Sequence, residues 1–138
     1  MWQKTITLAE YAKGCHLITD QILSAIRPGL QETDTGLLNL FVQHTSCALT
    51  INENCDPDVR RDMDMALDRI VPETLPWRHT DEGPDDSASH TKSALIGTSL
   101  NIPITAHVSP LCFFFFGFLP VHKTTLLPNL NTPGTSRR

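Results

Sequence analysis

Short segments in which apolar and polar residues alternate recur through the first three-quarters of the chain. Residues 2–8 are typical, because Trp2, Ile6 and Leu8 fall on one side of an extended chain. Pro103 places the last of these segments at the edge of a sheet, since proline cannot donate a hydrogen bond to a neighbouring strand. The predicted strands are residues 2–8, 14–19, 36–42, 47–51 and 100–104.

Three further segments carry the apolar spacing and the end signals of helices. The first, over residues 19–29, opens on a threonine and an aspartate and ends at a Pro-Gly pair. The second has Asp56 as its cap and Pro57 at its first helical position, and Pro72 ends it. The third, over residues 86–96, stops at a glycine. Short strands mixed with three helices predict an α+β fold.

The composition changes after residue 106. Residues 1–106 hold all fifteen acidic residues and eight of the eleven Lys and Arg, whereas residues 107–138 hold no acid, five of the six phenylalanines and four prolines. The apolar run within this last segment spans nine residues, well below the roughly 20 that cross a bilayer. We therefore predict a domain over residues 1–106 and a divergent, disordered or poorly packed tail over residues 107–138.

Charge and cysteine usage narrow the classes of function. The acidic body argues against sequence-independent nucleic-acid binding, because phosphate contacts need clustered Lys and Arg. The four cysteines have no CxxC or CxxH spacing, which argues against a zinc finger and favours reduced thiols in the cytosol. The N-terminus carries no pattern of a secretory signal. We expect a cytoplasmic protein that binds neither nucleic acid nor membrane.

Three histidines lie among hydroxyl and carboxyl groups. His44 follows a predicted buried strand and shares a strand face with Ser46, whereas His79 and His90 flank the acidic residues 80–86. Histidines and carboxylates gathered from separate elements form a pattern that builds divalent-metal or phosphate sites. Spacing alone leaves open the alternative that each histidine is a hydrogen-bonded structural residue and that residues 80–86 are a solvated turn.

Three stretches of the sequence point to one family. HTSCALTINENCDPDVRRDM, PETLPWRHTDEGPDD and SHTKSALIGTSLNIPI closely resemble the YjbQ-like family, described as secondary thiamine-phosphate-synthase-like proteins. The resemblance covers residues 1–106 and implies a small two-layer α+β fold with a mixed sheet, assembled as a homotrimer. The closing strands of the family pattern have no counterpart after Ala106, so we expect the C-terminal strands to be missing.

The resemblance also implies a pocket in which the histidines hold a divalent metal ion, zinc or magnesium, or an anion. The predicted metal ligands are His44, His79 and His90; the predicted catalytic residues are His44, Glu53 and Asp85; and the predicted ligand-binding residues are Ser46, Asn52 and Lys92.

Three functions fit these residues. The resemblance implies a weak thiamine-phosphate synthase, which joins a hydroxymethylpyrimidine diphosphate to a thiazole phosphate while a metal ion neutralises the phosphate charge and Glu53 or Asp85 acts as acid or base. The alternative enzyme is a metal-dependent hydrolase that activates water with the same ion. The non-catalytic alternative is a trimeric module that binds a small phosphorylated molecule, or an inactive variant isoform.

Overall fold

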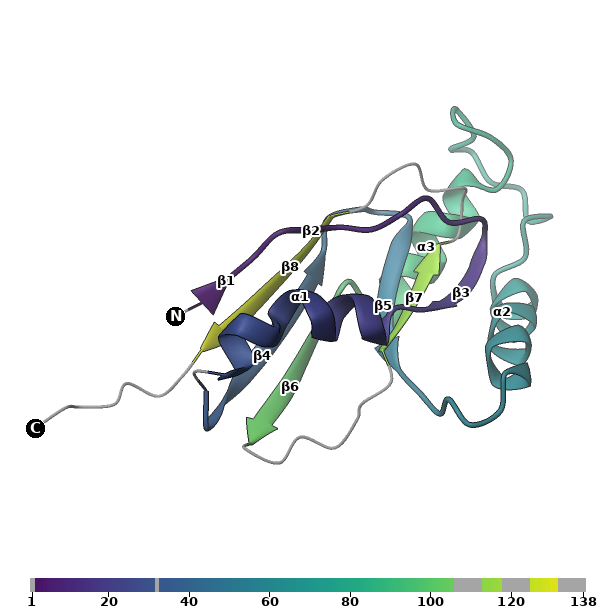
Figure 1. The fold of residues 1–138 in the computed structure, drawn as a ribbon. Coiled ribbons are helices and arrows are strands. Elements are labelled where there is room, and N and C mark those ends of the chain that lie inside the picture. The colour runs from purple at the N-terminus through teal and green to yellow at the C-terminus, as the bar shows by residue number, and fades with distance from the viewer. Residues whose placement is uncertain (1, 32, 106–112, 118–124, 132–138) are drawn as a thin grey trace, which may run out of the picture.

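The computed structural model describes residues 2–31, 33–105, 113–117 and 125–131, with the backbone alone at 113–117 and 131. These residues form two antiparallel sheets and three helices (Figure 1). The larger sheet has the order β1-β8-β4-β6, with β2 also paired to β8, and the smaller has the order β3-β7-β5. The strands are β1 (Trp2–Gln3), β2 (Ile6–Thr7), β3 (Gly14–Leu17), β4 (Thr35–Val42), β5 (Cys47–Ile51), β6 (Ser99–Thr105), β7 (Phe113–Gly117) and β8 (Thr125–Asn131).

The α+β prediction is confirmed, but the sheets are antiparallel rather than mixed. Every strand pair among the described residues is antiparallel. Parallel neighbours need a crossover connection, usually a helix, between two strands of one sheet. Here α1 (Thr19–Gln31) connects β3 to β4, and α2 (Asp58–Ile70) and α3 (Asp86–Ile96) lie between β5 and β6. Each of these connections links the two sheets, so no helix joins neighbouring strands in the described part of the chain.

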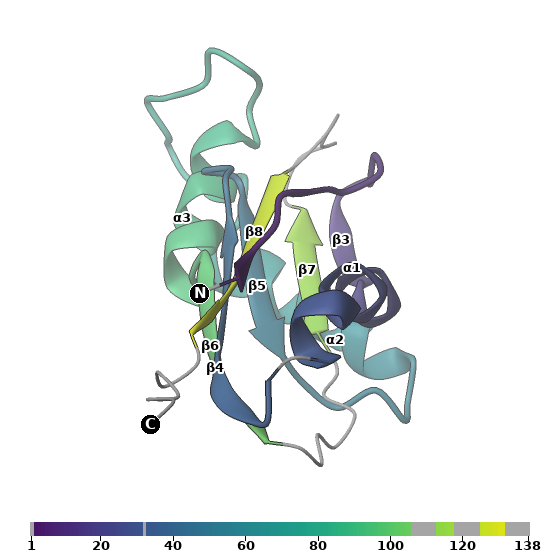
Figure 2. The same ribbon diagram turned by 60° about the vertical axis from the view of Figure 1, so that its left-hand side comes forward.

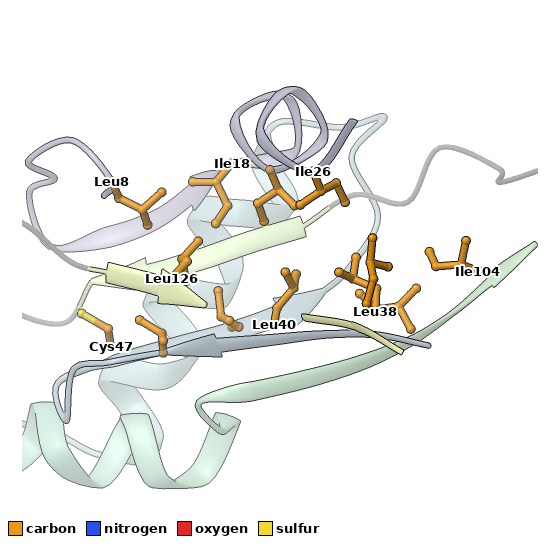
Figure 3. Close-up of a cluster of buried hydrophobic side chains, with 13 residues drawn as sticks. Leu8, Ile18, Ile26, Leu38, Leu40, Cys47, Ile104 and Leu126 are labelled. Atoms are coloured by element: carbon orange, nitrogen blue, oxygen red, sulfur yellow. The ribbon is translucent and has the colours of Figure 1, made fainter. Parts of the chain in front are cut away.

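The main hydrophobic core lies between α1 and the strands. Ile22 and Ile26 of α1 are fully buried, one helical turn apart, and they pack with leucines of β4 and β8 (Figure 3). A second cluster joins Ala48 of β5 to Leu67 of α2. Because neighbouring residues of β5 point to opposite faces, the second cluster lies on the far side of the strands from α1. Figure 2 shows α1 and α3 on opposite sides of the strands.

The expectation that the C-terminal strands are missing is wrong. β8 pairs with β4 from Leu37↔Asn131 to Val42↔Leu126, and β7 lies between β3 and β5. Both strands therefore occupy central positions. The other parts of the predicted tail, residues 106–112, 118–124 and 132–138, lie outside the described residues, and the division of the chain at residue 106 stays a prediction.

Side chains of β8 alternate between buried and half-buried positions, as expected for a strand with one face on the core. Leu126, Pro128 and Leu130 are buried, and the residues between them are half-buried. Pro128 is unusual in a central strand because it cannot donate a hydrogen bond, but its carbonyl oxygen accepts one from the Lys4 N–H at 3.1 Å. A proline at this position of the ladder is thus compatible with pairing on both sides.

The predicted helices are confirmed, with shifts at their ends. α1 continues past the Pro-Gly pair to Gln31, where the Thr33 hydroxyl donates to the carbonyl of Gly29 at 2.8 Å. α2 begins two residues after Asp56, whose carboxylate accepts from the N–H of Asp58 at 2.8 Å. None of the described helices has the length and apolar composition needed to cross a membrane.

Candidate metal centre

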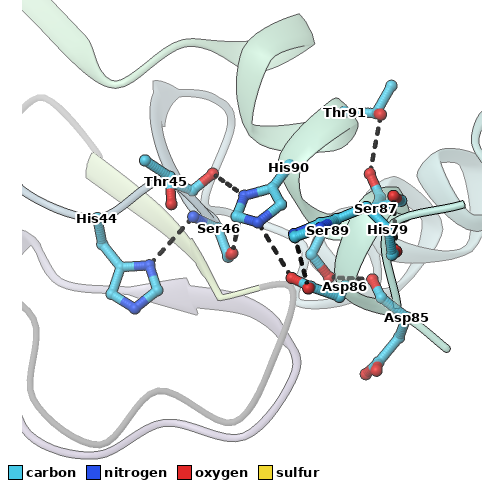
Figure 4. Close-up of polar contacts among 10 residues, drawn as sticks. All are labelled: His44, Thr45, Ser46, His79, Asp85, Asp86, Ser87, Ser89, His90 and Thr91. Atoms are coloured by element: carbon cyan, nitrogen blue, oxygen red, sulfur yellow. Dashed lines mark hydrogen bonds and ion pairs between the residues drawn. The ribbon is translucent and has the colours of Figure 1, made fainter. Parts of the chain in front are cut away.

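Three ionisable side chains meet at the N-terminal end of α3. Asp86 is the first residue of this helix, and His90 follows one turn later on the same face. His79 comes from the preceding loop, and its carbonyl oxygen accepts a hydrogen bond from the Ser87 hydroxyl at 2.8 Å, which ties the loop to the helix (Figure 4). The helix thereby fixes two of the three groups and anchors the third.

The Asp86 carboxylate lies between the two imidazoles. Its Oδ2 is 3.0 Å from Nε2 of His79, and its Oδ1 is 3.0 Å from Nε2 of His90. One ligand atom from each residue lies within 4.8 Å of the others. The Asp86 side chain is 0% exposed, whereas those of His79 and His90 are 56% and 36% exposed. The cluster therefore has a buried anionic base and imidazoles open to solvent.

Hydrogen bonding assigns the proton on His90. Its Nδ1 lies 3.1 Å from the carbonyl oxygen of Thr45, which can only accept, so Nδ1 carries the hydrogen. The Ser46 hydroxyl lies 3.3 Å from the same nitrogen. In the neutral ring, Nε2 then presents a lone pair to Asp86. A ring whose far N–H donates to a backbone carbonyl is the usual state of a metal-ligating histidine.

Asp86 lacks the hydrogen bonds that a buried carboxylate normally has. The imidazole nitrogens are near its oxygens, but neither oxygen receives a correctly directed hydrogen bond within the described structure. Burying a charge without such partners is costly unless an opposite charge stands beside it. A cation between the carboxylate and the two imidazole nitrogens would supply that charge.

His44 lies beside this cluster and not in it. The group of close ligand atoms consists of His79, Asp86 and His90, whereas His44 Nδ1 accepts a hydrogen bond from the Ser46 N–H at 3.0 Å. His44 lines an open cavity of about 600 Å³ that also reaches His90. The cavity is lined by Phe41, Val42, Gln43, His44, Thr45, Ser46, Glu82, His90 and Thr98.

Asn52 and Glu53, two predicted site residues, shape the turn before α2. Glu53 Oε1 accepts from the N–H groups of Cys55 at 2.6 Å and Asp56 at 3.1 Å. Asn52 Oδ1 accepts from the N–H of Glu53 at 2.8 Å. Neither residue lines the cavity beside His90. These contacts account for both side chains as turn residues.

Two more predicted site residues, Asp85 and Lys92, also have contacts away from the cavity. Asp85 precedes α3, and its carbonyl oxygen accepts from the Ser89 hydroxyl at 2.7 Å. Lys92 is 1% exposed and binds Asp68 of α2, which also binds Lys13 at 2.7 Å. Partial burial acts to raise the pKa of Asp68, but its hydrogen bonds with the two lysines outweigh this and lower the pKa. Lys92 thus holds α3 to α2.

The carboxylate that joins the histidines is Asp86, adjacent to the predicted Asp85. The sequence feature that could have identified Asp86 is its spacing. Residues four apart on a helix share a face, and Asp86 is four residues before His90. Glu82 was also missed as a cavity residue. It belongs to a loop, where no regular period shows which side chains face the site.

Sequence and structure comparisons identify the family of the chain. A family model described as UPF0047 protein YjbQ-like matches residues 4–110. The chain belongs to this family. It is 50% identical over 105 residues to the UPF0047 protein YjbQ of Salmonella typhimurium, covering 75% of each chain. It is 39% identical over 103 residues to a UPF0047 protein of Synechocystis, covering 74% of this chain and 69% of the relative.

Solved structures extend the likeness beyond residue 110. An uncharacterised YjbQ/UPF0047 protein from Clostridium acetobutylicum is 25% identical with a TM-score of 0.75, covering 95% of this chain and 100% of its own. A YbjQ-like protein of unknown function from Sulfolobus solfataricus has a TM-score of 0.80 at 15% identity, covering 94% and 96%, and shows the fold alone. The YjbQ-like fold thus includes more of this chain than the segment that the family model matches.

Proposed function

We propose that the protein binds a divalent metal ion through His79, Asp86 and His90 and uses it to act on a small phosphorylated molecule in the adjoining cavity. One observation carries the proposal. The Nδ1 proton of His90 is committed to the Thr45 carbonyl, so its Nε2 lone pair faces a buried carboxylate that has no directed hydrogen bond. Two such acceptors 3.0 Å apart need a proton or a cation between them.

The ligand set favours a metal ion. Two imidazole nitrogens and one carboxylate are the three protein ligands of many catalytic zinc sites, which leave further positions open to water or substrate. Solvent reaches the site on the histidine side, because His79 and His90 are partly exposed. A bound ion would act as a Lewis acid on a phosphoryl oxygen and would activate water.

The cavity supports a phosphorylated ligand only in combination with the ion. Its described lining has no Lys or Arg and includes the acidic Glu82, so the side chains alone would repel an anion. Hydroxyl groups of Thr45, Ser46 and Thr98 offer neutral hydrogen-bond donors. A volume of about 600 Å³ lies within the usual range of about 300–1,000 Å³ for small-molecule sites.

Hydrolysis of a phosphate ester is the reaction with the fewest requirements, since it needs the ion, water and one substrate. The thiamine-phosphate-synthase reaction is the second candidate. It is favoured by the family resemblance and by a cavity with room for more than a phosphate group. The resemblance also supports a homotrimer, which light scattering would report at three times the chain mass of 15.4 kDa.

The test begins with metal binding. Isothermal titration of the metal-free protein with zinc, manganese and magnesium should show one site per chain, and Asp86→Asn should lose it. His16→Asn is the matched control, because His16 lies outside the cluster and bonds the Ala12 carbonyl. Equal affinity in the wild type and in Asp86→Asn would refute the site. Phosphatase substrates and thiamine phosphate formation, assayed with the metal-loaded protein, then separate the two reactions.

A further inference from the structure

His44 and His90 carry their protons on different nitrogens. The Ser46 N–H donates to Nδ1 of His44 at 3.0 Å, and because an amide N–H can only donate, that nitrogen presents its lone pair. A neutral His44 ring therefore has its hydrogen on Nε2. A doubly protonated ring would place two N–H groups against each other. His90 has the opposite arrangement, with its hydrogen on Nδ1 toward the Thr45 carbonyl.

One short turn sets both tautomers. Residues 44–46 supply the Ser46 N–H that fixes His44, together with the Thr45 carbonyl and the Ser46 hydroxyl that contact His90. In Figure 4 the ring of His44 lies on the other side of Ser46 from His90 and Asp86. The two histidines are thus prepared for different tasks, with His90 offering an Nε2 lone pair and His44 an Nε2–H group.

A histidine in the state of His44 cannot ligate a metal as it stands. Its Nδ1 lone pair is occupied by the Ser46 N–H, and its Nε2 has a hydrogen in place of a lone pair. Within the described part of the chain, Nε2 has no hydrogen-bond acceptor, although His44 is only half-buried and is one of the residues that line the cavity. An unused N–H donor at the wall of a cavity is available to a ligand.

We propose that His44 is a fixed hydrogen-bond donor to a phosphoryl oxygen of the ligand, and not a ligand of the metal. This inference rests on the proposed function. The described lining of the cavity has no Lys or Arg, so neutral donors must orient the oxygens that the metal ion does not hold. His44 touches the ligand in this assignment, whereas Ser46 is a positioning residue that acts through both rings.

Two substitutions at position 44 separate these roles. In His44→Asn the amide oxygen can accept the Ser46 N–H, but the side chain is too short to present a donor where Nε2 stood. His44→Gln keeps an N–H near that position. We expect both variants to bind zinc as the wild type does. Inorganic phosphate should bind the zinc-loaded protein at least about 10-fold more weakly in His44→Asn and within about threefold of the wild type in His44→Gln.

Two results of the comparison at position 44 would overturn the inference. A loss of zinc affinity in both variants comparable to that of Asp86→Asn would make His44 a metal ligand. Unchanged phosphate affinity in His44→Asn would remove its role as a donor. If the wild type bound no zinc, the proposed function would fail, and the phosphate role of His44 would fail with it.

The tautomers are tested without any metal. Long-range proton–nitrogen NMR spectra of the metal-free full chain should show the Nε2–H form for His44 and the Nδ1–H form for His90. Signals are assigned with His44→Gln and with His90→Gln. An Nδ1–H form for His44 would overturn the inference even if zinc bound at the cluster, so its failure is distinguishable from failure of the proposed function.

Discussion

Replacing Asp86 by asparagine asks whether its carboxylate is a metal ligand or one half of a structural ion pair. The side chain is fully buried, no directed hydrogen bond reaches either oxygen within the described structure, and the nearest imidazole nitrogens are 3.0 Å away. With both imidazoles neutral, Asp86→Asn removes an uncompensated buried charge from the metal-free protein. The new amide can also donate to the lone pair on Nε2 of His90.

The expected difference in stability between Asp86→Asn and the wild type has opposite signs without and with zinc. Relieving an unsatisfied buried group stabilises by about 1–3 kcal/mol, and losing an acid from the first turn of α3 costs about 0.3–1 kcal/mol. Metal-free Asp86→Asn should therefore be more stable than the wild type by about 1–2 kcal/mol, or about 3–8 °C in Tm. Zinc at about 100 times its Kd should stabilise the wild type by about 2.7 kcal/mol and leave the variant unchanged.

Thermal melts followed by circular dichroism, in EDTA and in zinc, test this ranking. The variant should melt above the wild type in EDTA and below it in zinc, while His16→Asn should keep the zinc response. The reasoning is refuted if the metal-free variant is destabilised by about 3–5 kcal/mol, the loss expected when a buried ion pair is broken. That result would mean that a protonated imidazole, and not a metal ion, balances the carboxylate.

Four further predictions concern the ion pairs, thiols and packing of the fold. Asp68→Asn should lower the free energy of unfolding in urea by about 2–3 kcal/mol, because it leaves the buried ammonium of Lys92 without this carboxylate. Lys92→Met should lower it by less, because the carboxylate that remains is 43% exposed and water can solvate it. Since the pKa of Asp68 is lowered in the folded state, its contribution to stability is present above the ordinary aspartate pKa of 3.8 and should be lost as the pH of the melt falls through the lowered pKa. Iodoacetamide at pH 8 should alkylate the exposed Cys55 but not Cys15, where burial raises the thiol pKa to about 12; peptide mapping distinguishes them. Gly29→Ala should destabilise by about 1–3 kcal/mol in the same urea titration, because the added methyl would lie 2.6 Å from an indole carbon and 2.7 Å from a leucine methyl.

The sequence was informative about most of the elements in which one face is buried. The edge position of β6 followed from Pro103, and the end of α3 followed from the glycine at position 97. β8 was missed because residues 107–138 were read as a tail from their four prolines and from the absent closing strands of the family pattern, although Leu126, Pro128 and Leu130 alternate with half-buried residues. The antiparallel order of the sheets was also missed, since the strand period is the same in parallel and antiparallel pairs.

The site was predictable in part. His79 and His90 were recognised beside acidic residues, and the structure brings them together. The choice between the adjacent Asp85 and Asp86 depends on where α3 begins. Only Asp86 lies within the helix four residues before His90, so only Asp86 shares its face. The helix was predicted to start at residue 86, as observed, but Asp85 was taken from the family resemblance, which did not use the spacing of Asp86 and His90.

Backbone groups determine which nitrogen of His44 and of His90 carries the hydrogen, and residue types alone do not show where these groups lie. The carbonyl of Thr45 fixes the hydrogen of His90, and the N–H of Ser46 fixes that of His44. Every residue except proline carries both groups, so the residue types at positions 45 and 46 do not mark these two as special. The sequence could therefore name the three histidines as one set of metal ligands, but it could not separate a histidine that offers a lone pair from one that offers an N–H group. The turn over residues 44–46 makes that division, because it presents an acceptor to one ring and a donor to the other.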